Sequence, residues 1–464
     1  MEDLNATVWL PDLIYDGPAF DTGVALVVDG RGRIHRKAQP DQAQSLIRLK
    51  NRALLPGLVN AHSHAFQRLI RGRTEHRTSN PQDSFWTWRE MMYSAANRLG
   101  PDDIYDASRM TFLEMALSGV TTVGEFHYLH HAPDGKPYDD SNLLAKEVVR
   151  AALDVGLRIA LLRVAYARSG HQLKQNPQQL RFIEDNTELY LERLGQLRSD
   201  LASVERAWVG VAPHSVRAVP LDYLKRVIGF AQQQQLVVHM HVAEQPAEVV
   251  ACQEEYGSSP VALLQTEGLL SERFTAVHAI HVTPDEVSAL AAARAHICAC
   301  PTTERNLGDG IVPVDSFFAA GAPVCLGSDS HTQIDLLEDA RELEYHLRLQ
   351  LMERSILAPS SVTRSALADR LFACATSHGA HSLGFSGGRL EPGMPADFFT
   401  VDLDDPSIAG ASMEDLLPAI VFSLSRTAVR DVVVGGKMIV KDGRHRDQSE
   451  IVERFKVLQK RLWN

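Results

Sequence analysis

The chain has 464 residues, of which 45% are hydrophobic and 23% charged, and its formal net charge at pH 7 is −11. This composition predicts a soluble globular protein, and the negative charge argues against non-specific binding to nucleic acid or an anionic membrane. The first residues lack the segments of a secretory signal, and no run of about 18 apolar residues is present to span a membrane. The five cysteines are few and odd in number, which is typical of reduced thiols, so we expect a cytoplasmic protein.

The first part of the chain, residues 1–52, holds short apolar runs separated by turn residues, as in VALVVDGRGRIHR. This pattern is typical of β-strands joined by tight turns rather than of helices. We therefore expect residues 1–55 to contribute strands to a small β domain rather than to a helical one.

The middle of the chain alternates apolar runs with longer amphipathic segments. Near-continuous apolar runs are typical of strands that are buried on both faces of a parallel sheet. Eight such runs separated by helical patterns predict an α/β fold, a TIM-like (β/α)8 barrel at residues 56–384, with a doubly wound open sheet as the alternative. The predicted strands lie at residues 53–64, 120–128, 157–166, 207–215, 236–244, 274–282, 296–303 and 322–330.

The last part of the chain returns to short strands, in ADFFTVDLDDP and in VRDVVVGGKMIVKDGRH. Gly435 and Gly436 separate two apolar runs, which indicates a β-hairpin. Both ends of the chain therefore show the same pattern of short strands separated by turns. We expect residues 1–55 and 385–464 to form a composite β-sandwich domain beside the barrel.

Histidines and a carboxylate fall at the predicted carboxyl ends of barrel strands, where the active site of such a barrel forms. His62 and His64 end the first strand and, being two residues apart, point to the same side. His241 ends the fifth strand, and Asp329 follows a glycine at the end of the eighth. Three histidines and one carboxylate suit one Zn²⁺-like ion, with a position left for water. The alternative is a set of buried histidines that hydrogen-bond within the fold.

Several segments together resemble the amidohydrolase superfamily, namely PGLVNAHSH, HVAE, HAIH, LGSDS and GGRLEPGMPADFFTVD. The resemblance spans nearly the whole chain and implies that the four residues above are the metal ligands. Many members hold two metals through a carboxylated lysine at the end of the fourth strand, but here that strand ends VAPHSVRAV, without a lysine. The chain therefore resembles the mononuclear deaminase branch, whose HxxE pair would be His241 and Glu244, and one divalent ion per chain is expected.

Within that branch the chain resembles the formimidoylglutamate deiminases, in NAHSHAFQR, FWTWRE, FHYLHH, APHSVRAV, HVAEQ and PTTERNLGDGIVP. The resemblance implies metal-dependent hydrolysis of N-formimino-L-glutamate to N-formyl-L-glutamate and ammonia, a step of histidine degradation. Asp329 would take a proton from the attacking water, and Glu244 would pass one to the leaving nitrogen. His278, in the sixth strand, would hydrogen-bond the developing charge.

A substrate with two carboxylates calls for arginine, whose planar fork binds a carboxylate through two hydrogen bonds. Arg89, in a loop after the first strand, and Arg217, just past the fourth, are predicted to bind these groups. Trp86 and Trp88 are expected to pack the loop that carries Arg89. Three further residues are predicted to line the same pocket: Gln67, Tyr128 and His214.

Two other functions stay open at this point. The first is deamination of a purine-like heterocyclic amine, although ring-amine deaminases of the branch usually carry Ser-Asn where this chain has Thr303 and Glu304. The second is a metal-binding scaffold without catalysis. As partners we expect a small dicarboxylate substrate and a second copy in a homodimer, as is common in the superfamily, but neither nucleic acid nor a membrane.

Overall fold

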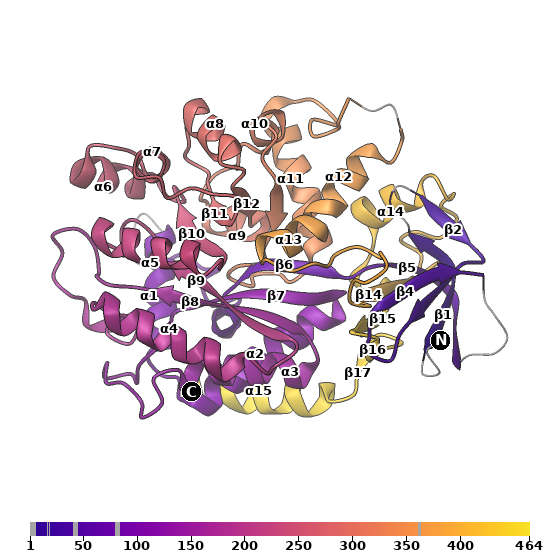
Figure 1. The fold of residues 1–464 in the computed structure, drawn as a ribbon, viewed down its shortest axis with the longest axis horizontal. Helices are drawn as coiled ribbons and strands as arrows, with labels where there is room; N and C mark the ends of the chain where they lie inside the picture. Colours follow the sequence, from indigo (N-terminus) through magenta and orange to yellow (C-terminus); the bar gives the residue numbers. More distant parts are fainter. Residues whose placement is uncertain (1–5, 16, 18, 40–44, 79–83, 361–362) are drawn as a thin grey trace.

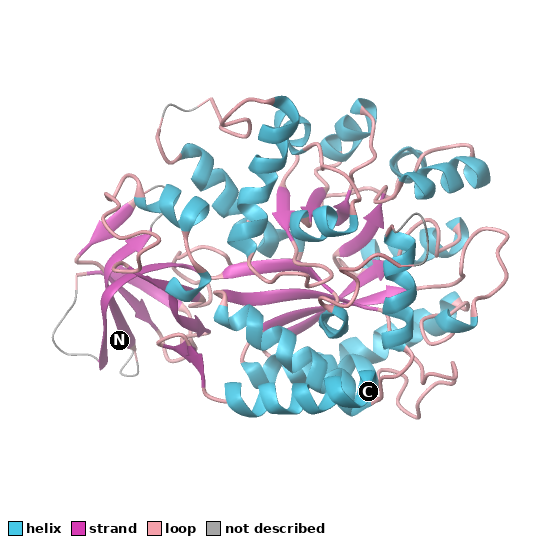
Figure 2. Cartoon of the chain, turned by 180° about the vertical axis from the view of Figure 1, so that it is seen from behind, coloured by secondary structure: helices cyan, strands magenta, loops and turns pink. Residues whose placement is uncertain are grey.

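A computed structural model describes residues 6–15, 17, 19–39, 45–78, 84–360 and 363–464 of the chain. In this part of the chain the strands form two sheets, one parallel with eight strands and one mixed with nine. Figure 1 shows the parallel strands at the centre of the molecule with helices around them, and the mixed sheet at one end. The view from behind in Figure 2 shows the same division.

The eight parallel strands form the predicted barrel. They are β6 (Leu58–Ser63), β7 (Val120–His127), β8 (Arg158–Ala165), β9 (Ala207–Pro213), β10 (Val238–Val242), β11 (Phe274–His278), β12 (His296–Ala299) and β13 (Val324–Leu326). Each strand pairs with the next one along the chain. A bridge between Ser63 and Asp329 then joins the last strand to the first, so the sheet is nearly closed. Every position of β7 and β8 is buried, which explains their near-continuous apolar sequences.

Helices cover the outside of the barrel, and their ends follow capping rules. Thr283 and Glu286 form a capping box at the start of α8, and Gly156 ends α3 with a left-handed φ of 104°. The α-helices are α1 (Phe85–Ala96), α2 (Pro101–Leu117), α3 (Leu143–Val155), α4 (Thr187–Leu201), α5 (Leu221–Gln233), α6 (Pro246–Tyr256), α7 (Pro260–Thr266), α8 (Pro284–Ala292), α9 (Pro301–Leu307), α10 (Val314–Ala319), α11 (Leu336–Leu351), α12 (Ala366–Cys374), α13 (Ser377–Ser382), α14 (Leu416–Ser423) and α15 (Gln448–Trp463). The 3₁₀ turns are η1 (Ala65–Ile70), η2 (Pro177–Gln179) and η3 (Arg426–Ala428).

The mixed sheet is built from both ends of the chain, as predicted. Its strands are β1 (Thr7–Tyr15), β2 (Phe20–Thr22), β3 (Ala25–Val28), β4 (Ile34–Ala38), β5 (Ser45–Pro56), β14 (Phe398–Asp402), β15 (Val429–Val434), β16 (Lys437–Lys441) and β17 (Arg444–His445). The two halves meet where β5 pairs antiparallel with β14. Gly435 and Gly436 both have positive φ, 55° and 72°, and form the predicted turn between β15 and β16.

The C-terminal helix α15 lies along the barrel helix α2, below the barrel in Figure 1. Arg454 binds Asp106 through two hydrogen bonds of 2.7 and 3.0 Å, and Arg109 pairs with Glu450 at 2.9 Å. The predicted division assigns this helix to the composite β domain, but its contacts are with the barrel. The boundaries at residues 55 and 385 themselves stay predictions.

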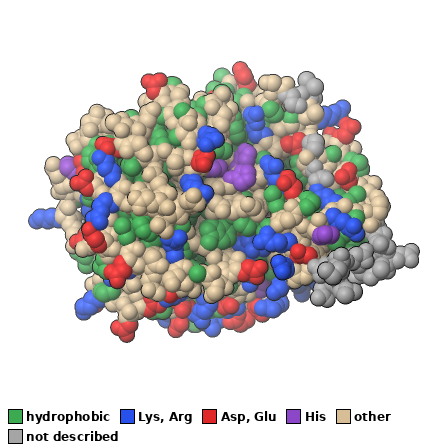
Figure 3. Space-filling view, in the orientation of Figure 1, with side chains coloured by type: hydrophobic (Ala, Val, Ile, Leu, Met, Phe, Trp, Pro, Cys, Tyr) green, Lys and Arg blue, Asp and Glu red, His purple; other side chains and the backbone are tan. Residues whose placement is uncertain are grey.

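The main hydrophobic core lies between the barrel strands and the helices and includes the fully buried Phe112, Phe126 and Phe274. A smaller core inside the mixed sheet is centred on Trp9 and Phe398, whose rings meet edge to face at 5.2 Å. On the face seen in Figure 3, acidic and basic side chains lie among one another. None of the helices in the described ranges is both long enough and apolar enough to cross a membrane.

Candidate metal-dependent active site

A cavity lies at the carboxyl ends of the barrel strands and spans about 550 Å³ when the solvent-open space at its mouth is included. It lies where the sequence predicts an active site for this fold. The predicted site residues that line it are His64, Gln67, Arg89, Tyr128, His214, Arg217, His241, Glu244, His278 and Asp329. His62 is fully buried next to His64 and His241. The fold therefore brings together all the residues that the sequence analysis selected, and their individual roles stay predictions.

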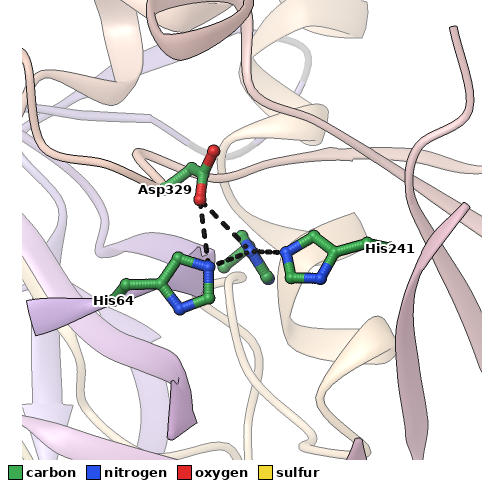
Figure 4. Close-up of side chains that lie close together, drawn as sticks. His64, His241 and Asp329 are labelled. Carbon is green, nitrogen blue, oxygen red and sulfur yellow. Dashed lines mark hydrogen bonds and ion pairs between the residues drawn. The ribbon is translucent and has the colours of Figure 1, made fainter. Parts of the chain in front are cut away.

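The four predicted ligands converge on one point. His62 Nε2 lies 3.2 Å from both His64 Nε2 and His241 Nε2. The Asp329 Oδ1 atom lies 3.4 Å from His62 Nε2 and 3.2 Å from His64 Nε2. Figure 4 shows His64, His241 and the Asp329 carboxylate turned toward a common centre. These donor atoms lie within 4.8 Å of one another, close enough to share one ion.

The hydrogen bonds of two of these rings fit a cation at that centre. His64 Nδ1 lies 2.9 Å from the Phe126 carbonyl oxygen, and His241 Nδ1 lies 3.1 Å from that of His214. Carbonyl oxygens only accept, so each Nδ1 carries the proton and each Nε2 presents a lone pair. Lone pairs and a carboxylate that face one another without a proton repel each other unless a cation lies between them. The residues thus fit a divalent metal ion, with backbone carbonyls orienting two of the ligands.

Burial keeps these rings in the form that binds metal. Desolvation by burial lowers the pKa of His62 to about 3 and holds that of His241 well below its usual value. A neutral imidazole is the ligand that Zn²⁺ requires. The ligand set is therefore available for metal binding at neutral pH.

Strained backbone conformations occur at the strand ends that carry the site residues. Ala243, His278 and Asp329 have φ values of 51°, 70° and 46°, in the left-handed region that non-glycine residues rarely adopt. They follow or end β10, β11 and β13, respectively. Such conformations cost about 1–3 kcal/mol each and gather at functional sites, where the surrounding fold holds them. Strand β13 ends at Leu326, so Asp329 lies three residues beyond it, whereas the sequence placed Asp329 within the predicted strand at residues 322–330.

Glu125, which the sequence analysis did not single out, holds the segment on both sides of His64. Its carboxyl group accepts hydrogen bonds from the Ser63 hydroxyl and from the Ala65 backbone N–H. Burial raises the pKa of Glu125 to about 7. The side chain reaches this segment because β7 lies next to β6 in the barrel. The sequence placed Glu125 within a predicted strand but carried no sign of its partner.

Glu244 and His278 lie beside the ligand set. His278 Nε2 is 3.8 Å from Glu244 Oε1 and 3.8 Å from Asp329 Oδ2, and it has no hydrogen-bond partner among the described residues. Burial raises the pKa of Glu244, which suits a carboxyl group that must hold a proton transiently. Burial opposes protonation of His278, but the nearby carboxyl groups of Glu244, Glu304 and Asp329 raise its pKa to about 10.

Arg89 and Arg217 both line the cavity, although they lie far apart in the sequence. Both side chains contact the same aromatic ring. Their guanidinium carbons lie 4.4 and 5.7 Å from the centroid of Trp86. Trp86 therefore does more than pack a loop, and Arg89 lies on the helix α1 rather than on the predicted loop. Arg89 Nε and Arg217 Nη1 are buried and lack hydrogen-bond partners in the described part of the chain. Two cationic groups with free donors thus face the same cavity.

Three other predicted residues form the side of the cavity near His64. Gln67 lies in η1 and donates a hydrogen bond of 2.8 Å to the hydroxyl of Tyr128. The Gln67 Oε1 atom has no partner among the described residues. The His214 ring packs against Tyr166 at 4.7 Å, and its carbonyl oxygen accepts from His241 as described above. Gln67 and Tyr128 thus form one polar pair that can meet a substrate together.

Other cavity residues had weak or no sequence signals. Tyr93, Tyr166 and Phe182 form an aromatic wall with edge-to-face or tilted contacts. Glu248 is buried and accepts from the Ala243 N–H at 3.2 Å. Burial lowers the pKa of Arg217, but Glu248 and nearby tyrosines raise it above its usual value. Glu248 lies in α6, four residues after Glu244, which precedes the helix, and the sequence analysis did not single it out.

Residues 53–439 match the sequence model of the amidohydrolase family. The chain belongs to the amidohydrolase family. Its sequence is 37% identical over 444 residues to a formimidoylglutamate deiminase from Pseudomonas aeruginosa, which covers 96% of each chain. It is also 28% identical over 435 residues to a 5-methylthioadenosine/S-adenosylhomocysteine deaminase from Syntrophomonas wolfei, covering 92% of this chain and 90% of the other. This amidohydrolase is thus a hydrolase whose relatives include deaminases.

Solved structures of amidohydrolases have the same fold. The crystal structure of an amidohydrolase from Brucella melitensis superposes with a TM-score of 0.90 at 33% identity and covers 99% of this chain and 100% of the other. That of an adenosine deaminase from Xanthomonas campestris with bound zinc gives a TM-score of 0.82 at 22% identity and covers 98% of each. The barrel with its composite β domain is therefore the shared architecture, and the histidine and aspartate cluster is the metal site expected of this metal-dependent family.

Proposed function

We propose that this amidohydrolase hydrolyses N-formimino-L-glutamate to N-formyl-L-glutamate and ammonia, a step of histidine degradation, with one Zn²⁺ per chain. The observation that carries the proposal is the pair of guanidinium groups, Arg89 and Arg217, that face the cavity beside the ligand set with donors unpaired. The similarity to the Pseudomonas aeruginosa deiminase supports the same substrate.

The charge of the cavity favours an anionic substrate. Arg89 and Arg217 approach one ring, and no salt bridge to a carboxylate is found for either in the described ranges. Two neighbouring cations with buried, unpaired donors are costly unless an anion satisfies them. A dicarboxylate can offer one carboxylate to each fork, with bidentate geometry at each. A heterocyclic amine without acidic groups would leave both donors unpaired.

Three carboxyl and imidazole groups can carry the proton transfers. A divalent ion held by this ligand set would lower the pKa of a water molecule and so supply a nucleophile near neutral pH. Asp329 accepts a proton from the attacking water, and the oxygen adds to the formimino carbon. Glu244 delivers a proton to the nitrogen that leaves as ammonia, so the C–N bond breaks as a C=O bond forms. His278 Nε2 lies between Glu244 and Asp329 and donates a hydrogen bond to the developing charge.

Deamination of a heterocyclic amine is the second candidate. The deaminase relative from Syntrophomonas wolfei and the aromatic wall of Tyr93, Tyr166 and Phe182 favour it. These rings contact one another edge to face or at a tilt, as do Tyr128 and Phe182 at 5.2 Å and 89°. Aromatic rings pack well edge to face, so this wall could also contact a bound heterocycle. The arginine pair therefore decides our preference.

The test is ammonia release by the metal-loaded enzyme from a panel of amines. It contains N-formimino-L-glutamate, N-formiminoglycine, adenosine and 5-methylthioadenosine at equal concentrations. We expect kcat/KM to be highest for N-formimino-L-glutamate and at least about 10-fold lower for N-formiminoglycine, which lacks one carboxylate. Faster turnover of either nucleoside would replace this proposal with the second candidate. The homodimer and the cytoplasmic location stay predictions.

A further inference from the structure

A buried carboxyl group lies behind His278, on the side away from the cavity. Glu304 belongs to the short helix α9 and is 1% exposed. Its Oε1 atom accepts two hydrogen bonds, one of 2.8 Å from the Cys300 backbone N–H and one of 3.1 Å from His278 Nδ1. The first bond fixes the carboxyl group to the backbone at the start of α9. The second hydrogen bond then holds the imidazole ring of His278 against this fixed carboxyl group.

The backbone alone leaves the direction of the His278 ring weakly determined. His278 and Ala279 both have positive φ, 70° and 50°, so the strand β11 ends in two consecutive left-handed residues. Such a segment lacks the regular strand geometry that normally orients a side chain. The ring lies parallel to that of His241, with an interplanar angle of 14° and a centroid distance of 5.6 Å. This contact sets the plane of the ring but leaves open whether Nε2 or the carbon Cε1 faces the cavity.

The hydrogen bond to Glu304 decides that Nε2, and not the carbon Cε1, faces the cavity. A carboxylate oxygen only accepts, so Nδ1 must carry a proton and point toward α9. Nε2 then points into the cavity, between Glu244 Oε1 and Asp329 Oδ2 at 3.8 Å from each. This nitrogen is buried and has no partner among the described residues, so it is free to meet a reacting atom. A ring turned by 180° would instead present carbon atoms to part of that space.

We infer that Glu304 is the positioning residue for His278: its carboxyl group, anchored on the Cys300 N–H, holds the ring with Nε2 aimed at the reacting atoms. The inference rests on the proposed function, in which His278 stabilises the developing charge. Glu304 itself touches His278 and the backbone at Cys300, so it acts through another residue. Its loss should therefore slow the chemical step without weakening the binding of substrate.

Two substitutions separate the hydrogen bond from simple packing. Glu304→Gln keeps an oxygen acceptor of the same size, and Glu304→Met keeps much of the volume without the acceptor. We expect kcat to fall less than about 10-fold in Glu304→Gln and on the order of 10- to 100-fold in Glu304→Met, with KM within about threefold of wild type in both. Metal content per chain and the melting temperature are measured on the same samples.

The matched control is Glu286→Gln, which alters another buried carboxyl group that does not line the cavity. Glu286 accepts from the Ser259 hydroxyl and the Thr283 N–H at the start of α8. We expect its kcat and KM to equal those of wild type. A fall in kcat as large as that of Glu304→Met would indicate a general effect of disturbing a buried carboxyl group and would overturn the inference.

A double-mutant cycle gives the sharpest readout. In the background of His278→Gln, adding Glu304→Met should change kcat less than about threefold, because the residue through which Glu304 acts is gone. Equal effects of Glu304→Met in both backgrounds would overturn the inference, as would a kcat of Glu304→Met close to that of wild type. If wild type does not release ammonia from N-formimino-L-glutamate, the proposed function fails, and the cycle is run on the amine that wild type does deaminate.

Discussion

Asp329 and His64 are joined twice, once through the backbone and once through their side chains. The His64 N–H donates to the Asp329 carbonyl oxygen at 3.1 Å, and His64 Nε2 lies 3.2 Å from Asp329 Oδ1. The neighbouring Asp329 N–H donates in turn to the His62 carbonyl oxygen at 3.0 Å. These bonds link the first and last strands of the barrel. Closure of the barrel and assembly of the metal site are therefore the same structural event.

The ligand set predicts one Zn²⁺ per chain. Metal analysis of the purified protein should find one ion per chain, and Asp329→Ala or His241→Ala should lose most of it, because each removes one of the four converging donors. Removal of metal by a chelator should abolish ammonia release, and added Zn²⁺ should restore it. Two ions per chain, or an unchanged metal content in both variants, would contradict this prediction.

Glu244→Gln should retain the metal and the fold but lose most turnover. The amide has the size of the carboxyl group but cannot shuttle a proton, and general acid–base catalysis is typically worth about 10²–10⁴-fold in rate. Steady-state kcat measures the loss, with metal content as the check that the site is intact. Glu254→Gln on the exposed side of α6 serves as the control. A kcat for Glu244→Gln near that of wild type would remove this residue from the mechanism.

Arg89 and Arg217 should each recognise one carboxylate of the substrate. A hydrogen bond to a charged group contributes about 1.5–3 kcal/mol, so Arg89→Met and Arg217→Met should each lower kcat/KM for N-formimino-L-glutamate on the order of 10- to 100-fold. At least one of the two should affect N-formiminoglycine much less, since that substrate has a single carboxylate. Arg89→Lys and Arg217→Lys should restore kcat/KM only in part, because the ammonium group of lysine is a point charge and lacks the planar pair of donors of arginine. Equal losses on both substrates for both variants would argue against dicarboxylate recognition.

Trp86 should influence substrate binding through the two arginines that it contacts. Trp86→Leu removes the ring that lies 4.4 and 5.7 Å from their guanidinium carbons, and a cation–π contact is worth about 0.5–2 kcal/mol. We expect KM to rise about 3- to 30-fold, with a smaller change in kcat. Trp208→Leu, which disrupts a stack on Phe385 at 5.3 Å, is the control. The prediction fails if both variants change KM equally.

A buried ion pair should make the stability of the protein depend on pH. Glu184 binds Arg163 at 2.7 and 3.0 Å, and although burial raises the pKa of Glu184, this arginine lowers it well below its usual value. The ionised pair therefore stabilises the fold above the unfolded pKa of about 4.3, and this contribution is lost as pH falls toward the lower folded pKa. Glu184→Gln should cost about 3–5 kcal/mol at pH 7, because it leaves Arg163 buried without its counter-charge.

Urea unfolding at pH 7, 5, 4 and 3 checks that prediction. The difference in the free energy of unfolding between wild type and Glu184→Gln should be largest at pH 7 and should become smaller below about pH 5. Glu188→Gln alters an ion pair with Arg226 at the surface and should change the unfolding midpoint little at any pH. If the difference in unfolding free energy stays the same at every pH, the charge of Glu184 is not the source of its stabilising effect.

Features that depend on local spacing could be predicted from the sequence. The alternation of apolar runs with amphipathic segments predicted the eight barrel strands, because strands buried on both faces must be apolar throughout. The spacing of His62 and His64 placed both rings on one side of a strand. Gly435 and Gly436 predicted the turn that they form, because a two-residue hairpin turn requires positive φ and glycine adopts it without strain.

Contacts between residues far apart in the chain could not be predicted from the sequence, because they depend on how the barrel packs. Glu125 reaches Ser63, and Glu304 reaches His278, through the lateral order of strands and helices, which hydrophobic periodicity does not report. His278 and Asp329 adopt left-handed backbone without the glycine that would have signalled it, because the packed barrel supplies the energy to hold the strain. Trp86 meets Arg217 for the same reason: a contact between residues far apart in the chain is set by closure of the barrel, not by the local sequence.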